Sequence, residues 1–237
     1  MSEYNLNNNY GTGYGATSGA STVSSTMKRV YVKMTLGLLV TALVSLALAS
    51  SAGYMTFLVS HSWMMWVFLL AELGIVFAIS GALNRLSSPV ATMLFYVFAA
   101  LNGATLCTIF YAYSAAAITK TFFITAGTFG AMSVFGYTTR QDLSKFGAFL
   151  FMALIGLIIA SVVNLFLHSD GLSWIVSIIG VLIFVGLTAW DTQQIKNMAA
   201  MGAIEPSRLA TIGALNLYLD FINLFLYLLR IFGNSRD

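Results

Sequence analysis

The sequence predicts an all-α membrane protein with seven transmembrane helices. Of its residues, 59% are hydrophobic and only 8% are charged, whereas a soluble domain is about one quarter charged. The chain also contains seven apolar runs, each long enough to cross a hydrocarbon core of about 30 Å as a helix of about 20 residues. These two observations exclude a soluble fold.

The apolar runs define the expected order of elements. The expected spans are residues 35–59, 63–83, 90–112, 118–138, 146–168, 172–195 and 209–232. Because the connections are short, we expect one helical domain at 28–237 with no inserted soluble domain. Residues 1–27 are rich in Asn, Gly, Ser, Thr and Tyr and hold too little apolar surface to repay ordering. We therefore expect this segment to be a disordered cytoplasmic tail.

Basic residues predict how the helices are oriented. With the N-terminus in the cytoplasm, the cytoplasmic segments hold eight of the eleven basic residues, namely Lys28, Arg29, Lys33, Arg85, Arg140, Lys145, Lys196 and Arg208. The positive-inside rule then favours a cytoplasmic N-terminus and a C-terminus on the opposite side. These residues stand singly or in pairs at the ends of apolar runs, so they indicate topology and not a nucleic-acid partner. The expected surroundings are a lipid bilayer, most naturally a cell inner membrane.

The last span carries a polar stripe. Asn216, Asp220, Asn223, Tyr227 and Arg230 follow one another at spacings of 4, 3, 4 and 3, so they share one helix face. The other faces are Leu, Ile and Phe, which predicts that the stripe faces protein or a cavity. An ionisable group at membrane depth is a functional candidate, so Asp220 indicates proton or cation handling. For the asparagines and Tyr227, an interhelical hydrogen-bond seam is an equally good interpretation.

A second aspartate, Asp191, lies near the end of the sixth span. Counting at 1.5 Å per residue puts Asp191 roughly 28 Å from the outer start of its helix and Asp220 roughly 16 Å from the cytoplasmic side. These depths do not match unless helix tilt or a shifted helix start closes the gap. If the two carboxyl groups meet, they cannot both ionise comfortably in a low dielectric, so they would share a proton and respond to pH. Alone, Asp191 is equally well explained as a solvated interfacial residue.

Three other charged residues complete the candidates. Glu72 lies mid-span in the second helix and Arg230 lies near the outer end of the seventh, so the two could form an ion pair on the outer side. A Glu72 that is protonated and hydrogen-bonded is the alternative. Arg85, at the cytoplasmic end of the second span, is explained most simply as an anchor whose charged end reaches the interface.

Catalytic and metal-binding patterns do not fit the chain. His61 and His168 stand in separate outward loops, so neither can serve a serine nucleophile or complete a zinc motif. Two aspartates on neighbouring spans are shared in outline with intramembrane aspartyl proteases, but Asp220 is preceded by LYL instead of the required GxG. We therefore expect no enzyme activity, no cofactor and no tightly bound metal.

Three segments resemble the transmembrane Bax inhibitor motif family, most closely its bacterial, YccA-like branch. They are GAMSVFGYTTRQDLS at 130–144, AWDTQQIKNM at 189–198 and GALNLYLDFINLFLYLLRIFG at 213–233. The resemblance extends over residues 28–234. It implies two three-helix layers around a central C-terminal helix, and a pH-sensitive calcium leak in which Asp191 and Asp220 form a hydrogen-bonded pair.

The resemblance also assigns supporting residues. It implies that Glu72 and Arg230 lie along the same pathway as the aspartates. It further implies a gate arginine near the cytoplasmic end of the second helix. Counting from Glu72 places Leu83 at that position, with Arg85 two residues later, so Arg85 is the gate candidate and is displaced from the family pattern.

Two functions are therefore expected. The first is a passive, pH-sensitive leak for Ca²⁺ or other cations through the membrane, built on Asp191 and Asp220. The second is a membrane-embedded regulator without transport activity, which would act on a partner such as a membrane quality-control protease. The polar N-terminal tail motivates the second function, and the sequence does not separate the two.

Overall fold

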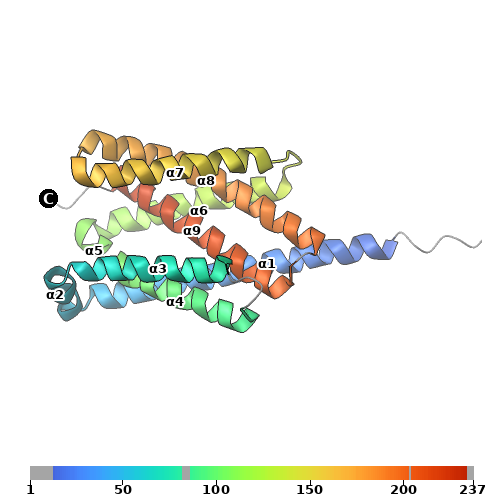
Figure 1. Cartoon of the computed structure of the whole chain (residues 1–237), viewed down its shortest axis with the longest axis horizontal. Coiled ribbons are helices and arrows are strands. Elements are labelled where there is room, and N and C mark those ends of the chain that lie inside the picture. Colours follow the sequence, from blue (N-terminus) through green and yellow to red (C-terminus); the bar gives the residue numbers. More distant parts are fainter. Residues whose placement is uncertain (1–12, 82–85, 203, 234–237) are drawn as a thin grey trace, which may run out of the picture.

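The computed structural model describes residues 13–81, 86–202 and 204–233, with side chains from residue 21 onward. These parts of the chain fold into helices that run along a common axis (Figure 1). In order they are α1 (Gly13–Ala49), α2 (Ala52–Ser60), α3 (Trp63–Gly81), α4 (Ser88–Leu106), α5 (Ile109–Ala112), α6 (Ala115–Thr138), α7 (Ser144–Leu167), α8 (Asp170–Met201) and α9 (Pro206–Phe232).

The seven expected transmembrane helices are confirmed. Helices long and apolar enough to cross a membrane cover Ser21–Ala49, Trp63–Gly81, Ser88–Ala112, Ala115–Thr138, Ser144–Leu167, Asp170–Met201 and Pro206–Phe232. Large apolar side chains are turned outward along them, among them Phe77 at 71% exposure and Phe166 at 80%. Such a surface suits contact with lipid tails and would be an aggregation hazard in water.

The first helix differs from the expectation at both ends. It starts at Gly13, well inside the segment expected to be a disordered tail; residues 1–12 lie outside the described residues. Met27, Val30 and Met34 are spaced by 3 and 4 residues and are all buried, so one face of α1 packs on the bundle from Met27 onward. The expected boundary between residues 27 and 28 missed this packing.

At its other end α1 stops at Ala49, and residues expected in the same span form the separate helix α2. The break occurs at a pair of serines. The side chain of Ser51 accepts a hydrogen bond from the backbone N–H of Tyr54 at 3.4 Å, which caps the new helix. The first span is therefore interrupted where the sequence was expected to continue as one helix.

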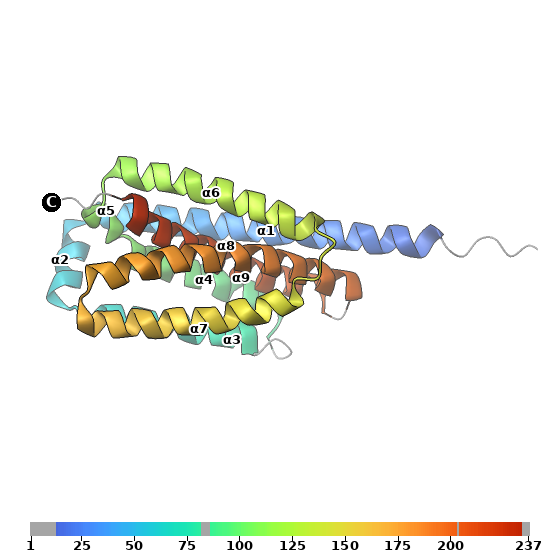
Figure 2. The ribbon, with the colours of Figure 1, turned by 90° about the horizontal axis from the view of Figure 1, so that it is seen from above.

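Helix α9 occupies the centre of the bundle. It contacts α1, α3, α4, α6 and α8, and most of its residues are buried. Helix α4 contacts α1 and α3, while α8 contacts α6 and α7, so α9 touches helices of both groups (Figures 1 and 2). The central position agrees with the polar stripe on this helix. The layered arrangement that the resemblance implies stays a prediction.

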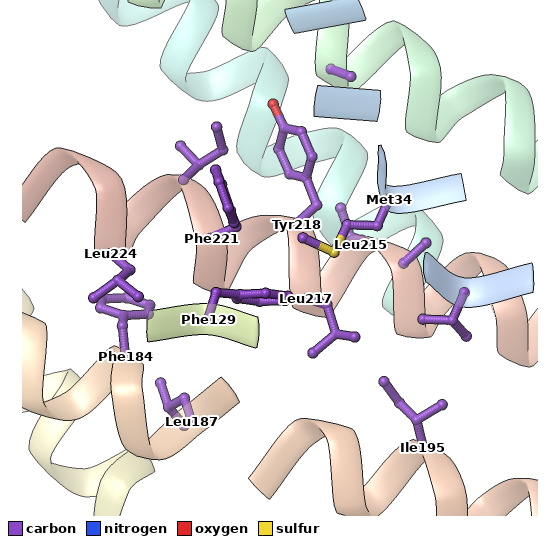
Figure 3. Close-up of a cluster of buried hydrophobic side chains, with 14 of the residues drawn as sticks. Met34, Phe129, Phe184, Leu187, Ile195, Leu215, Leu217, Tyr218, Phe221 and Leu224 are labelled. Carbon is purple, nitrogen blue, oxygen red and sulfur yellow. The ribbon is translucent and has the colours of Figure 1, made fainter. Parts of the chain in front are cut away.

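Aromatic and leucine side chains fill the space between α6, α8 and α9 (Figure 3). Phe221 of α9 packs edge-on against Phe129 and Phe122 of α6, with ring centroids 5.5 and 5.7 Å apart. Phe184 and Leu187 approach from α8. Because lipid tails are as apolar as these side chains, such close packing, and not exclusion of water, holds membrane helices together.

Candidate functional site

Helices α8 and α9 bring the two expected aspartates together. The side chains of Asp191 and Asp220 lie close enough to interact, and Asn216 lies beside Asp191. Asp191 is 8% exposed and Asp220 is 4% exposed. Asn216 stands one helical turn before Asp220, so the same face of α9 supplies both groups to Asp191. We call these three residues the aspartate site.

The estimated depths of Asp191 and Asp220 disagreed because α8 was expected to end too early. That helix continues to Met201, past the expected end at residue 195, and closes there because Gly202 adopts a left-handed backbone with φ of 64°. Measured from the turn that joins α8 to α9, Asp191 is roughly 15 Å along α8 and Asp220 roughly 21 Å along α9. The two carboxyl groups therefore lie at comparable depths.

One oxygen of the aspartate site has no amide or hydroxyl donor. Oδ2 of Asp220 is buried and accepts no hydrogen bond from such a group in the described part of the chain. The hydroxyl of Thr192, which follows Asp191, is likewise buried and unpartnered there. Buried polar atoms without partners are costly and rare in proteins, so each calls for a functional or structural reason.

Close helix packing fixes the position of Asp191. A Cβ atom on Gly136 of α6 would collide with the backbone of Ala189, and one on Gly147 of α7 would collide with the ring of Trp190. Both glycines lie beside the segment that carries Asp191. Because these glycines have no side chain, α6 and α7 can approach α8 closely beside Ala189 and Trp190.

The connection between α6 and α7 is hydrogen-bonded to the same part of α8. The Gln193 side chain donates to the carbonyl of Gln141 and accepts from the N–H of Leu143, both at 2.8 Å. Lys196 donates to the carbonyl of Tyr137 at 2.7 Å. The segments at 130–144 and 189–198 that carry the family resemblance thus meet in space.

Asp142 stabilises that connection. Hydrogen bonds from the side chain and the backbone of Ser144 hold the pKa of the Asp142 carboxyl below its usual range, and the backbone bond measures 2.9 Å. Because Ser144 is the first residue of α7, the carboxylate also satisfies an N–H at the start of that helix.

The other residues of the polar stripe on α9 contact different neighbours. Tyr227 packs against Gly180 of α8 and stacks with Phe184, with ring centroids 5.9 Å apart. Arg230 lies over the Tyr227 ring at 5.7 Å from its centroid. The Asn223 amide donates to the carbonyl of Leu219 in its own helix. The expected common face is therefore directed at α8 through Asn216, Asp220 and Tyr227, while Asn223 bonds within α9.

Glu72 does not pair with Arg230. It accepts hydrogen bonds from Asn102 at 3.3 Å and Thr105 at 3.2 Å, both on α4, whereas Arg230 lies in a cavity between α7, α8 and α9. In the described residues no ion pair joins Glu72 to Arg230. The expected ion pair was wrong because helix counting gives depth but not direction: the two side chains leave the bundle centre on different sides.

A chain of hydrogen bonds continues from Glu72 across the bundle. Asn102 accepts from the hydroxyl of Tyr218 at 3.1 Å, and that hydroxyl is hydrogen-bonded to Thr41 at 2.6 Å. We call Glu72, Asn102, Tyr218 and Thr41 the four-helix network, since they come from α3, α4, α9 and α1. Sequence reasoning missed its last three members. Asn102 in mid-span was the available signal, because a polar side chain at that depth needs a partner.

Lys33 is a further residue whose role was missed. Its ammonium group donates to the hydroxyls of Thr92 at 2.9 Å and Thr211 at 2.6 Å, and so ties α1 to α4 and α9. The sequence indicated only a topology signal at this position. Arg85, the gate candidate on the second span, lies outside the described residues, as does Leu83.

Comparisons with known proteins show the family to which the chain belongs. Residues 23–237 match the Bax1-I family, described as inhibitor of apoptosis-promoting Bax1. The chain is 52% identical to the inner membrane protein YbhL of Escherichia coli K12 over 214 residues, which are 89% of this chain and 92% of that protein. It is 45% identical to an uncharacterized membrane protein of Streptococcus pyogenes serotype M3 over 166 residues, 69% and 72% of the two chains.

The matched region includes the whole described bundle from residue 23 onward and so contains both aspartates. The seven apolar helices and the similarity to an inner membrane protein together support a multi-pass location in the inner membrane. On the length of the family match and the identity to these relatives, the chain is a multi-pass membrane protein that belongs to the Bax1-I family.

Proposed function

We propose that this protein is a passive, pH-sensitive leak for cations, with Ca²⁺ as the expected ion and the aspartate site as its sensor. The observation that supports the proposal is the closeness of two carboxyl groups that are both buried in the bundle interior, one of which has an oxygen without an amide or hydroxyl donor. Ionisable groups at such depth are expensive to keep, which makes a purely structural role a poor explanation.

The chemistry of the pair supports a response to pH. A hydrogen bond between two carboxyl groups requires that one of them carry a proton, and a low dielectric opposes two adjacent negative charges. The pair would thus hold one shared proton and one negative charge. Gaining a second proton would remove the charge that attracts a cation. Losing the shared proton would push the two helices apart.

Flux measurements test the proposal. The full chain in liposomes should pass Ca²⁺ at a rate that depends on pH, because gain or loss of the shared proton changes the charge of the pair. Asp220→Asn should abolish this pH dependence, since an amide cannot share the proton. Asp170→Asn, at an exposed aspartate that begins α8 far from the aspartate site, is the matched control and should keep the dependence. An unchanged pH profile in Asp220→Asn would refute the proposal.

The orientation of the chain across the membrane is part of the proposal. We place the N-terminus in the cytoplasm and the C-terminus on the opposite side, on the basis of the eight-to-three distribution of basic residues. The start of α1 and the end of α9 lie at opposite ends of the bundle (Figure 1), as an odd number of crossings requires. Cysteine labelling from each side of the membrane, at residues added to the two ends, tests it.

A regulatory role is the second candidate, and the shape of α1 favours it. This helix extends beyond the ends of its neighbours as a projecting arm (Figures 1 and 2). A partner such as a membrane quality-control protease could bind this arm. Deleting residues 1–20 spares the buried Thr26 and Met27, so it should remove the partner from crosslinked complexes while leaving Ca²⁺ flux unchanged. Retention of the partner would argue against this role.

A further inference from the structure

A cavity of about 720 Å³ lies between α7, α8 and α9, where α9 ends. Helix α7 ends at Leu167 and α8 begins at Asp170, so the cavity sits at one end of the bundle (Figure 2). A site at a bundle end lies at the level of the lipid head groups. Neither the aspartate site nor the four-helix network contributes a residue to its lining.

Arg230 is the cation of this cavity. It is exposed, and its guanidinium group lies over the ring of Tyr227, 5.7 Å from the centroid. In the part of the chain that the structure describes, no carboxylate forms an ion pair with Arg230. The guanidinium fork is thus free to bind an anion, and its planar geometry matches a phosphate group in particular.

Tyr227 holds the guanidinium in place. Its ring lies so close to Gly180 that a Cβ atom there would collide with it, and it stacks on Phe184. A side chain enclosed in this way has little rotational freedom. The cation above it is therefore presented to the cavity at a small entropic cost.

The remaining lining suits a lipid molecule. Val162, Leu165 and Trp174 line the cavity and are 49%, 60% and 60% exposed, so its outer wall is continuous with the apolar surface of the bundle. Tryptophan is enriched where lipid tails meet head groups. Asp170, an exposed carboxylate in the same lining, could pair with an amine.

We propose that this cavity binds one phospholipid, with the head-group phosphate on Arg230 and an acyl chain along Val162, Leu165 and Trp174. A head group that carries an amine gains a second contact at Asp170. The lipid would brace the end of α9 against α7 and α8. This binding is independent of the leak proposed above, because it uses a different set of residues at the end of the bundle.

Native mass spectrometry tests the proposal with the full chain in an uncharged detergent. Phosphatidylethanolamine and phosphatidylglycerol should remain bound, whereas diacylglycerol, which lacks a phosphate, should not. Arg230→Gln should weaken both phospholipids roughly tenfold or more, as expected for losing a charge-assisted hydrogen bond. Asp170→Asn should weaken phosphatidylethanolamine only. Lys120→Gln is the matched control, since Lys120 is an exposed cation in the first two turns of α6, and Tyr113, just before that helix, lines the same cavity.

A second variant leaves the charges unchanged. Ser161→Phe would fill the cavity from α7 and should also displace phospholipid, with circular dichroism to show that the helices remain folded. The proposal is overturned if Arg230→Gln or a folded Ser161→Phe retains phospholipid like the parent chain. It is equally overturned if diacylglycerol binds as well as the phospholipids, if inorganic phosphate alone displaces them, or if Lys120→Gln weakens them as much as Arg230→Gln.

Discussion

The aspartate site and the four-helix network share helix α9 but differ in how completely their polar atoms are paired. Tyr218 stands two residues before Asp220 and faces α1 and α4, where its hydroxyl has two partners. Asp220 faces α8, and Oδ2 of its carboxyl group accepts no hydrogen bond from an amide or hydroxyl group in the described residues. A fully paired network rigidifies a membrane bundle, whereas an incompletely paired buried charge is maintained at a cost.

This difference separates two roles for polar residues in one bundle. The four-helix network joins four helices through neutral hydrogen bonds and the carboxyl of Glu72, so it suits a structural role. The aspartate site joins only two helices and concentrates two acids in one place. We therefore assign the pH response to the aspartate site, and the four predictions below test that division from the largest expected effect to the smallest.

The largest effect is expected from the two aspartates changed separately and together. Asp191→Asn should remove the pH dependence of Ca²⁺ flux, as proposed for Asp220→Asn, because either change leaves one carboxyl group without an acidic partner. The double variant should add nothing further, since residues that share one proton act as a unit. Flux in liposomes across pH measures all three, and independent, additive effects would contradict the idea of a pair.

The second effect concerns the helix that positions Asp191. Gly136→Val should destabilise the protein by about 1–3 kcal/mol, because the added side chain must push α6 away from the backbone of Ala189. Moving α8 should also shift the pH profile of flux. Gly130→Val on the same helix is the control, since a Cβ atom there meets nothing within 4 Å. SDS-induced unfolding in mixed micelles compares the two, and equal losses would show that the contact at Gly136 has no special weight.

The third effect concerns the hydroxyl at the centre of the four-helix network. Tyr218→Phe should cost about 1–3 kcal/mol of stability, because Oδ1 of Asn102 loses its donor and Thr41 loses one of its hydrogen bonds, although Thr41 still donates within the bundle. It should leave the pH dependence of flux in place. Tyr96→Phe on α4 is the control, since no hydrogen bond from its hydroxyl is recorded among the described residues. The same unfolding assay applies, and loss of the pH response in a folded Tyr218→Phe would break the division between the two regions.

Much of the fold was predictable because membrane helices follow local rules. Length and hydropathy located all seven spans, and a period of 3.6 residues placed Asn216, Asp220 and Tyr227 on one face of α9. Boundaries were less predictable. The sequence before Met27 looks too polar to order, but the tertiary contacts of Thr26 and Met27 favour the helix there.

Contacts between distant segments were the part that sequence could not supply. An ion pair between Glu72 and Arg230 was one of two interpretations, since their depths agree, yet Asn102 and Thr105 satisfy Glu72 by hydrogen bonds, as the other interpretation held. The opposite error affected Asp191 and Asp220, whose estimated depths disagreed although the residues are in contact. Depth along a helix follows from counting, whereas the direction of a side chain depends on which helices are neighbours.

The smallest effect is expected at Glu72, and it is the sharpest test of the comparison. Glu72→Gln keeps one oxygen that can accept a hydrogen bond but replaces the other with a donor, so either Asn102 or Thr105 loses its acceptor. We expect a loss of about 1 kcal/mol, the usual value of one hydrogen bond, in the unfolding assay. The pH response of flux should persist, because the proton that we assign to the response belongs to Asp191 and Asp220. If the response disappears while the protein stays folded, Glu72 lies on the pathway, as the family resemblance implies, and the four-helix network is part of the sensor.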